Sequence, residues 1–176
     1  MRIVTFHEEQ QFRQLWVWLL IVPLTFGTAI VFGYGMVTQL IFGTPWTGDP
    51  LPDAALLILG ALVILVMVGI NFMLILARMV TEVSEAGITV RFRPFVNRHI
   101  GWDEITGMAA RKYSPIGEYG GWGVRWSPGK GMAYNVRGNM GVELTLATGR
   151  KLMLGSQRHI ELAAAIDECM TRHGVD

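Results

Sequence analysis

The densest group of chemically versatile residues lies between Glu118 and Trp126, in the sequence EYGGWGVRW. Tryptophan, tyrosine and arginine supply rigid apolar area and a planar charge, the features that dominate protein interfaces. We expect a surface that binds a protein partner or a second copy of the chain, formed by Tyr119, Trp122, Arg125, Trp126, Tyr134 and Asn135. The alternative is structural: the glycines permit a bulge or sharp bend, and the two tryptophans fill the core.

A second group consists of three arginines, Arg91, Arg93 and Arg98, in one short stretch. Near an anionic membrane surface each such cation contributes about 1 kcal/mol, so these residues are candidates for lipid binding. A solvated strand face is the alternative. The neighbouring loop 84–87, SEAG, carries no basic residue, which argues against recognition of a specific inositide headgroup.

The remaining titratable residues do not predict catalysis. The four histidines lack the short spacings of metal sites, and the single cysteine, Cys169, cannot form an internal disulfide. Asp103 and Glu104 are adjacent carboxylates without a nucleophile or metal ligand nearby in the sequence. We therefore expect no catalytic residues, no metal, no cofactor and no enzymatic activity. A formal net charge of +1 disfavours nucleic-acid binding.

Two long stretches without charged residues precede most of these groups. Residues 54–77 are uncharged and would extend roughly 36 Å as a helix, enough to cross a hydrocarbon core of about 30 Å. Residues 15–42 are also uncharged and exceed the usual core of a signal peptide. We predict two transmembrane helices within 15–78, at about 15–42 and 54–77, joined by a short loop, 43–53.

The distribution of basic residues predicts the orientation of these helices. All fifteen lysines and arginines lie before Leu15 or from Arg78 onward, so the loop between the helices has none. The positive-inside rule then places both termini in the cytoplasm and the loop outside. We expect a multi-pass protein of the inner membrane, with residues 1–14 as a cytoplasmic lead-in.

Three residues predict how the two helices pack together. The amide of Asn71 is costly against lipid, so we expect it to bond to the first helix, at a backbone carbonyl or a threonine. A pore or substrate site is the alternative role for this residue. Ala29 and Gly33 have the small-xxx-small spacing that permits close helix approach.

From Met79 onward the apolar period changes from helical to two. Ile88, Val90 and Phe92 alternate with polar residues, as expected of half-buried strands. Pro128 and Gly129 predict a hairpin turn. The segment 160–170 is amphipathic with a helical period. About seven short antiparallel strands followed by one helix predict a pleckstrin-homology-like (PH-like) β-barrel, capped by a C-terminal helix, over residues 79–176.

Short motifs along nearly the whole chain carry a family resemblance. They are Thr81-Glu82-Val83, Arg91-Phe92-Arg93-Pro94-Phe95, Trp102-Asp103-Glu104-Ile105, Gly120-Gly121-Trp122-Gly123-Val124-Arg125, Ala133-Tyr134-Asn135-Val136 and Gly155-Ser156-Gln157-Arg158. The chain thereby resembles a family of short prokaryotic membrane proteins with two spans and a cytoplasmic PH-like domain. The resemblance implies this fold and no particular activity, because the family has no established function.

These features predict a non-catalytic membrane-anchored module that binds a protein partner, or a second copy of itself, at the inner membrane surface. One alternative is a sensor of anionic lipid headgroups that uses the basic strand residues. Another is an accessory subunit of a larger membrane enzyme or transporter. The expected partners are therefore the lipid bilayer and another protein or a homo-oligomer, and not a nucleic acid.

Overall fold

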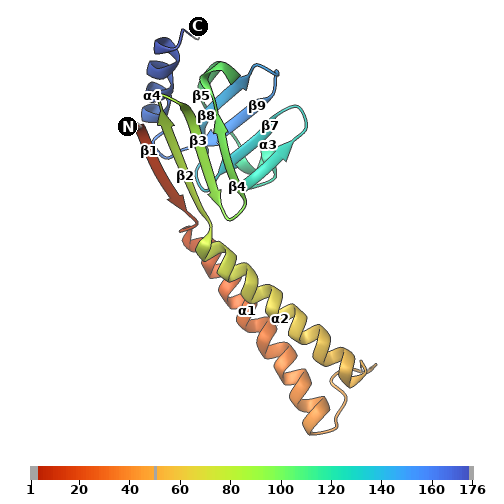
Figure 1. The fold of residues 1–176 in the computed structure, drawn as a ribbon. Helices are drawn as coiled ribbons and strands as arrows, with labels where there is room; N and C mark the ends of the chain where they lie inside the picture. The colour runs from red at the N-terminus through yellow and green to blue at the C-terminus, as the bar shows by residue number, and fades with distance from the viewer. Residues whose placement is uncertain (1–3, 50, 175–176) are drawn as a thin grey trace. The chain divides into compact units, whose positions relative to one another are not determined.

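A computed structural model describes residues 4–49 and 51–174 of the chain (Figure 1). The chain divides into two compact units. A helical unit comprises residues 13–75, and a strand-rich unit combines the residues before it with those from Leu76 onward. The strand-rich unit is therefore built from two separate parts of the chain.

The helical unit contains the two predicted apolar helices. Helix α1 (Leu15–Met36) continues through a π-helical turn, η1 (Val37–Ile41), and α2 (Asp53–Leu76) follows the connecting loop. Both are long enough and apolar enough to cross a membrane. The prediction of two helices that are long and apolar enough to span a membrane is confirmed. Their bounds agree with the predicted bounds within about one residue.

Polar contacts join the two helices of this unit. The side-chain amide of Asn71 donates to Thr25 Oγ1 at 2.7 Å and to the Met67 carbonyl at 2.8 Å. The predicted hydrogen bond to a threonine of the first helix is therefore present. These two bonds satisfy the polar amide within an otherwise apolar pair of helices.

Close approach in the helical unit occurs at glycines other than the predicted one. A Cβ atom at Gly33 would meet nothing within 4 Å, so this residue does not form the expected small-residue contact. Gly35 instead lies against the indole of Trp46, and Gly60 lies against Phe32 and Met36. Ala29 is only partly buried. The prediction from Ala29 and Gly33 is wrong because the face of α1 in closest contact contains Phe32, Gly35 and Met36.

The described residues of the strand-rich unit form nine strands in two sheets. The first sheet is antiparallel, in the order β1 (Val4–Gln11), β2 (Arg78–Ser84), β3 (Gly87–Arg93), β4 (Val96–Ile100). The second has the order β5 (Ile105–Lys112), β8 (Met140–Leu146), β9 (Lys151–Gly155), β7 (Gly131–Asn135), β6 (Gly123–Ser127). In it β7 and β9 are parallel and the other pairs antiparallel.

Three helical segments complete this unit: η2 (Trp102–Glu104), α3 (Pro115–Tyr119) and α4 (His159–Arg172). Helix α4 packs against β1, β2, β5 and β8 (Figure 1). Its buried face includes Leu162, Ile166, Cys169 and Met170, as its amphipathic pattern predicts. The core lies beneath this helix and between the inner faces of the sheets.

Two features of the predicted domain are corrected. The strands form two sheets rather than one closed barrel, and the described residues from Arg78 onward contain eight strands where about seven are predicted. Residues 4–11 are strand β1 and not merely a lead-in. The sequence does not predict this strand because two of its buried residues, Glu8 and Gln10, are polar, which hides the alternation.

Strand β1 is bonded to both sheets. It pairs with β2 along its length, and its inward polar side chains reach the end of β9. The carboxylate of Glu8 accepts bonds from Ser156 Oγ at 2.5 Å and from the Gln157 amide at 2.9 Å. Gln10 Nε2 donates to the Gly155 carbonyl at 2.9 Å. A segment that precedes both long helices therefore completes the fold that follows them.

Candidate ligand pocket

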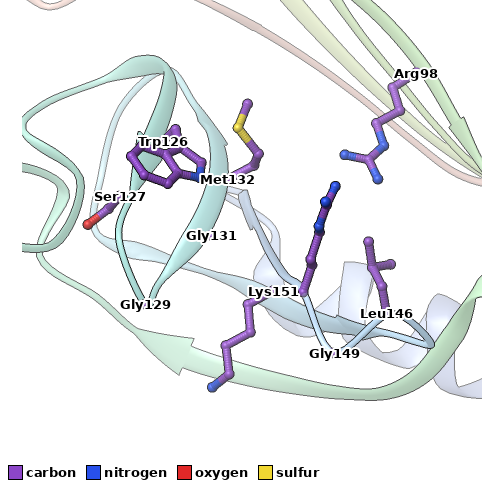
Figure 2. Close-up of a pocket in the computed structure, with 10 residues that line it drawn as sticks. Arg98, Trp126, Ser127, Gly129, Gly131, Met132, Leu146, Gly149 and Lys151 are labelled. Atoms are coloured by element: carbon purple, nitrogen blue, oxygen red, sulfur yellow. The ribbon is translucent and has the colours of Figure 1, made fainter.

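A pocket of about 590 Å³ lies between β4 of the first sheet and two turns of the second (Figure 2). We call it the cationic pocket. The turns are the β6–β7 hairpin and the β8–β9 connection. The lining residues are Arg98, Trp126, Ser127, Gly129, Gly131, Met132, Leu146, Gly149, Arg150 and Lys151.

Strand register explains why Arg98 faces this pocket. Arg98 is the cross-strand partner of Val90, which is fully buried. Directly opposed residues in an antiparallel pair point to the same face of the sheet, so Arg98 lies on the inward face of β4. Because β4 ends the order of the first sheet, this guanidinium reaches the open border of the core. Figure 2 shows it directed into the gap opposite Met132.

The β6–β7 hairpin supplies the apolar wall of the pocket. Its turn closes with a bond from the Lys130 amide to the Ser127 carbonyl at 3.2 Å, and Gly129 has a φ of +72°. The predicted hairpin turn is thus present. Trp126 pairs across the strands with Met132, whose next partner is the buried Leu152. Trp126 therefore lies on the inward face of an edge strand, and 67% of it is exposed.

The charged lining of the pocket is entirely basic. Arg98, Arg150 and Lys151 contribute positive charge, and none of the ten lining residues is acidic. Lys151 Nζ pairs with Glu143 Oε1 at 2.9 Å, and Figure 2 shows its side chain running away from Arg98. Within residues 4–49 and 51–174, Arg98 and Arg150 have no ion pair and no side-chain hydrogen bond. Their charge is available to a ligand.

This arrangement fits an anion joined to an apolar body. A guanidinium presents parallel N–H donors that match the oxygens of phosphate or carboxylate. An exposed indole and a methionine thioether provide a flat, polarisable surface beside them. The pocket supplies binding groups of two kinds, and its lining contains no histidine, cysteine or carboxylate for acid–base or metal chemistry.

The predicted partner surface is divided between core and exterior. Tyr119, Tyr134 and Asn135 are buried, so they are not available to a partner. The Asn135 side chain instead accepts a bond from the Gly123 amide at 2.9 Å, which fixes the start of β6. Tyr134 is turned into the main core by the register of β7, and Tyr119 packs in a separate buried cluster with Tyr113, Ala133 and Met153.

The other predicted partner residues lie outside the core. Trp122 is partly buried and donates from Nε1 to the Gly138 carbonyl at 3.2 Å. Arg125 is exposed but folds back, and its Nε donates to the Trp122 carbonyl at 2.9 Å. Trp126 alone of the six lines the pocket. The alternative role predicted for Trp126, filling the core, is therefore wrong.

The three predicted lipid-binding arginines do not share one surface. Arg91 pairs with Glu82 on the outer face of the first sheet. Arg93 is exposed at the end of β3, and Arg98 faces inward at the pocket. Although the three arginines are close in the sequence, they do not lie on one face of the sheet. The β3–β4 turn reverses the chain between Arg93 and Arg98.

A network of charged residues supports the second sheet beside Lys151. Arg111 Nη2 contacts Glu143 at 2.6 Å and Glu118 at 2.9 Å, which ties α3 to β5 and β8. The hydrogen bond from Arg111 is the main cause that lowers the pKa of Glu118. Burial opposes ionisation of Glu143, but bonds from Lys151 and Arg111 outweigh it and lower the pKa of that carboxyl.

These lowered pKa values predict a loss of stability in acid. A carboxyl whose pKa falls on folding stabilises the protein above its unfolded pKa, here near 4.5, and this contribution is lost as pH falls through the folded pKa. Glu118→Gln is expected to unfold at a lower Tm than the wild type at about pH 7, and the two Tm values should converge toward about pH 3. Circular dichroism melts of the full chain in neutral detergent measure this.

Glu168→Gln is the matched control, because Glu168 forms an exposed pair with Arg172. Exposed pairs contribute little to stability, so its melting curve should follow the wild type at each pH. A constant Tm difference between wild type and Glu118→Gln across the whole pH range would contradict the expectation.

No protein-family model matches the chain, and no curated protein matches it.

The sequence analysis names Arg98 and Trp126 as candidate binding residues. It does not name Met132, Arg150 and Lys151, which line the same pocket. Two basic residues directly after the turn at Thr148 and Gly149 are the signal that would draw attention to that segment. The sequence does not reveal that this turn lies beside the β6–β7 hairpin. That proximity depends on the parallel pairing of β7 with β9, which joins strands distant in the chain.

Proposed function

We propose that the chain is a non-catalytic, membrane-anchored module whose cationic pocket binds a phosphate-bearing anionic ligand with an apolar body. The observation that carries this proposal is the placement of Arg98 and Arg150 in one pocket with the exposed Trp126, where neither arginine has an acidic partner among the residues that the structure describes. Two guanidiniums match the double charge and tetrahedral oxygens of a phosphate better than a single carboxylate.

The arrangement of the chain supports the anchoring part of the proposal. Strand β1 precedes both long helices and pairs with β2, which follows them. Two residues paired in one sheet must be on the same side of a membrane, so the helices enter and return. With the absence of basic residues from loop 43–53, this favours an inner-membrane protein with both termini in the cytoplasm.

The resemblance to short prokaryotic two-span proteins with a PH-like domain belongs to the same proposal. It is supported by the mainly antiparallel strands and by a C-terminal helix packed on the core. The parallel pair β7–β9 and the contribution of β1 depart from a simple seven-stranded barrel. The parallel pair brings the β6–β7 hairpin beside the β8–β9 turn, and residues of both line the pocket.

Isothermal titration calorimetry of the full chain in neutral detergent tests the proposal. We expect saturable binding of short-chain phosphatidic acid and weaker or no binding of short-chain phosphatidylcholine, whose phosphate is accompanied by a cation. Arg98→Gln should weaken phosphatidic acid binding by about tenfold or more, because a hydrogen bond to a charged group contributes about 1.5–3 kcal/mol. Glycerol phosphate is titrated separately to determine whether the anionic group alone is sufficient.

Arg137→Gln is the matched control for this titration. Arg137 is an exposed arginine of the same unit that does not line the pocket, so its removal changes net charge equally. Equal weakening in Arg98→Gln and Arg137→Gln would mean non-specific charge attraction and would contradict a defined site.

A protein partner bound at the β6–β7 hairpin is the second candidate. It is favoured by the exposure of Trp126 on β6, the last strand in the order of the second sheet. Exposed tryptophans at unpaired strand edges are characteristic of contact surfaces. Binding of a protein that is lost in Trp126→Ala and retained in Arg98→Gln would favour this candidate over an anionic small ligand.

A further inference from the structure

The turn between β3 and β4 lies at the same end of the first sheet as the chain's connections to both long helices. Arg93 at the end of β3 is the cross-strand partner of Arg78 at the start of β2. Arg78 is in turn the partner of Gln11 at the end of β1. Gln11, Arg78 and Arg93 therefore form one row across the ends of three neighbouring strands. The Pro94–Phe95 turn follows directly after Arg93.

Covalent connection limits how far this row can be from the helices. Only three residues separate Gln11 from the start of α1 at Leu15, and only Ala77 separates α2 from β2. An extended residue spans at most about 3.6 Å, so the longer connection reaches no more than roughly 15 Å. If the two helices cross a bilayer, the row can be no farther than this from the helix ends at its surface.

The turn has the composition of a membrane-interface contact. Phe95 is 53% exposed although it is aromatic, and its ring lies 6.2 Å from that of the buried Phe92. Arg93 beside it is exposed and, in the described part of the chain, has no ion pair or side-chain hydrogen bond. An aromatic ring next to a free cation is suited to the headgroup region, where apolar and charged groups are both solvated.

We propose that the β3–β4 turn is a membrane-contact site, in which Phe95 inserts among lipid headgroups and Arg93 binds their phosphates. The site is separate from the cationic pocket, because Phe95 and Arg93 do not line that pocket. In this proposal the inserted turn adds a membrane contact to the two covalent connections. The proposal requires that the helices span the bilayer and does not require that the pocket binds a ligand.

Depth measurements on the full chain in lipid vesicles test the proposal. Phe95→Cys is labelled with an environment-sensitive fluorophore in a Cys169→Ala background, which removes the native thiol. In vesicles of mixed neutral and anionic lipid we expect blue-shifted emission, strong quenching by lipids that carry a nitroxide at the headgroup, and loss of quenching by aqueous iodide. Adding Arg93→Gln should reduce the blue shift and the protection from iodide in vesicles that contain anionic lipid. It should leave both unchanged in vesicles of neutral lipid alone.

Ala86→Cys is the matched control, because Ala86 is exposed in the turn at the opposite end of the same sheet. Seven strand residues separate the two ends by roughly 20 Å, so this label should remain accessible to iodide. Equal accessibility of the labels at positions 95 and 86 would overturn the proposal. A label at Leu65 in α2 that is not quenched from the lipid phase would also overturn it, since the helices would then not span.

Discussion

Gly131→Ala is expected to lower the free energy of unfolding of the strand-rich unit by about 3 kcal/mol, a large effect for the addition of one methyl group. Two independent features of the structure cause this sensitivity. Gly131 has a φ of +80°, a conformation that costs an L-residue about 1–2 kcal/mol. A Cβ atom there would also collide with the backbone carbonyl of Lys151.

The collision cannot be relieved by rotation of a side chain. Gly131 begins β7, and Lys151 begins the parallel strand β9, so both backbones are held by the sheet. Separating them would weaken the pairing that brings the β6–β7 hairpin beside the β8–β9 turn. We therefore expect Gly131→Ala to reduce ligand binding at the cationic pocket as well as stability.

Gly129→Ala separates the two causes. Gly129 lies in the same hairpin with a similar φ of +72°, but a Cβ there would meet nothing within 4 Å. Its expected cost is about 1 kcal/mol, from backbone conformation alone. Guanidinium unfolding of the full chain in detergent micelles, followed by near-ultraviolet circular dichroism, gives both values. An equal loss of unfolding free energy in the two variants would show that the close approach of Gly131 to Lys151 does not contribute to the effect.

Glu8→Ala is expected to have a comparable effect, also about 3 kcal/mol, because it leaves two donors without a partner. The carboxylate of Glu8 is buried and accepts bonds from Ser156 Oγ and the Gln157 amide. These bonds connect β1 to the segment before α4. Their loss should weaken the attachment of the whole strand, so its amides should exchange with deuterium faster than those of β3.

Glu9→Ala is the control for the effect of Glu8. Glu9 is the adjacent acidic residue of β1, exposed on the opposite face, where it contacts Arg78 at 3.4 Å. An exposed ion pair contributes about 0–1 kcal/mol, so this variant should be close to the wild type in stability. If the two variants are equally stable, the buried bonds of Glu8 do not secure β1.

The parts of the fold that the sequence predicts are those encoded locally. The two apolar helices, the turn at Pro128 and Gly129 and the amphipathic helix α4 all follow from short-range patterns and are present. The bond between Asn71 and Thr25 is predictable because an amide in an apolar helix must find a partner.

The parts that the sequence does not predict depend on pairings between distant segments. Strand β1 resembles a polar lead-in because Glu8 and Gln10 are polar, and their burial makes sense only beside Ser156 and Gly155. The local sequence around Trp126 suggests either a partner surface or the core. The residue occupies the border between them because β6 is an edge strand, a property of sheet order that the local sequence does not specify.

The proposed role of the cationic pocket is tested most directly by calorimetric titration of the full-length Arg98→Gln Arg150→Gln variant with short-chain phosphatidic acid. This variant lacks the guanidiniums of Arg98 and Arg150 and keeps Trp126 in the pocket lining. We predict saturable binding by the wild type and its loss in the double variant, with an unchanged circular dichroism spectrum. Equal affinity of the wild type and the double variant would contradict the proposed role.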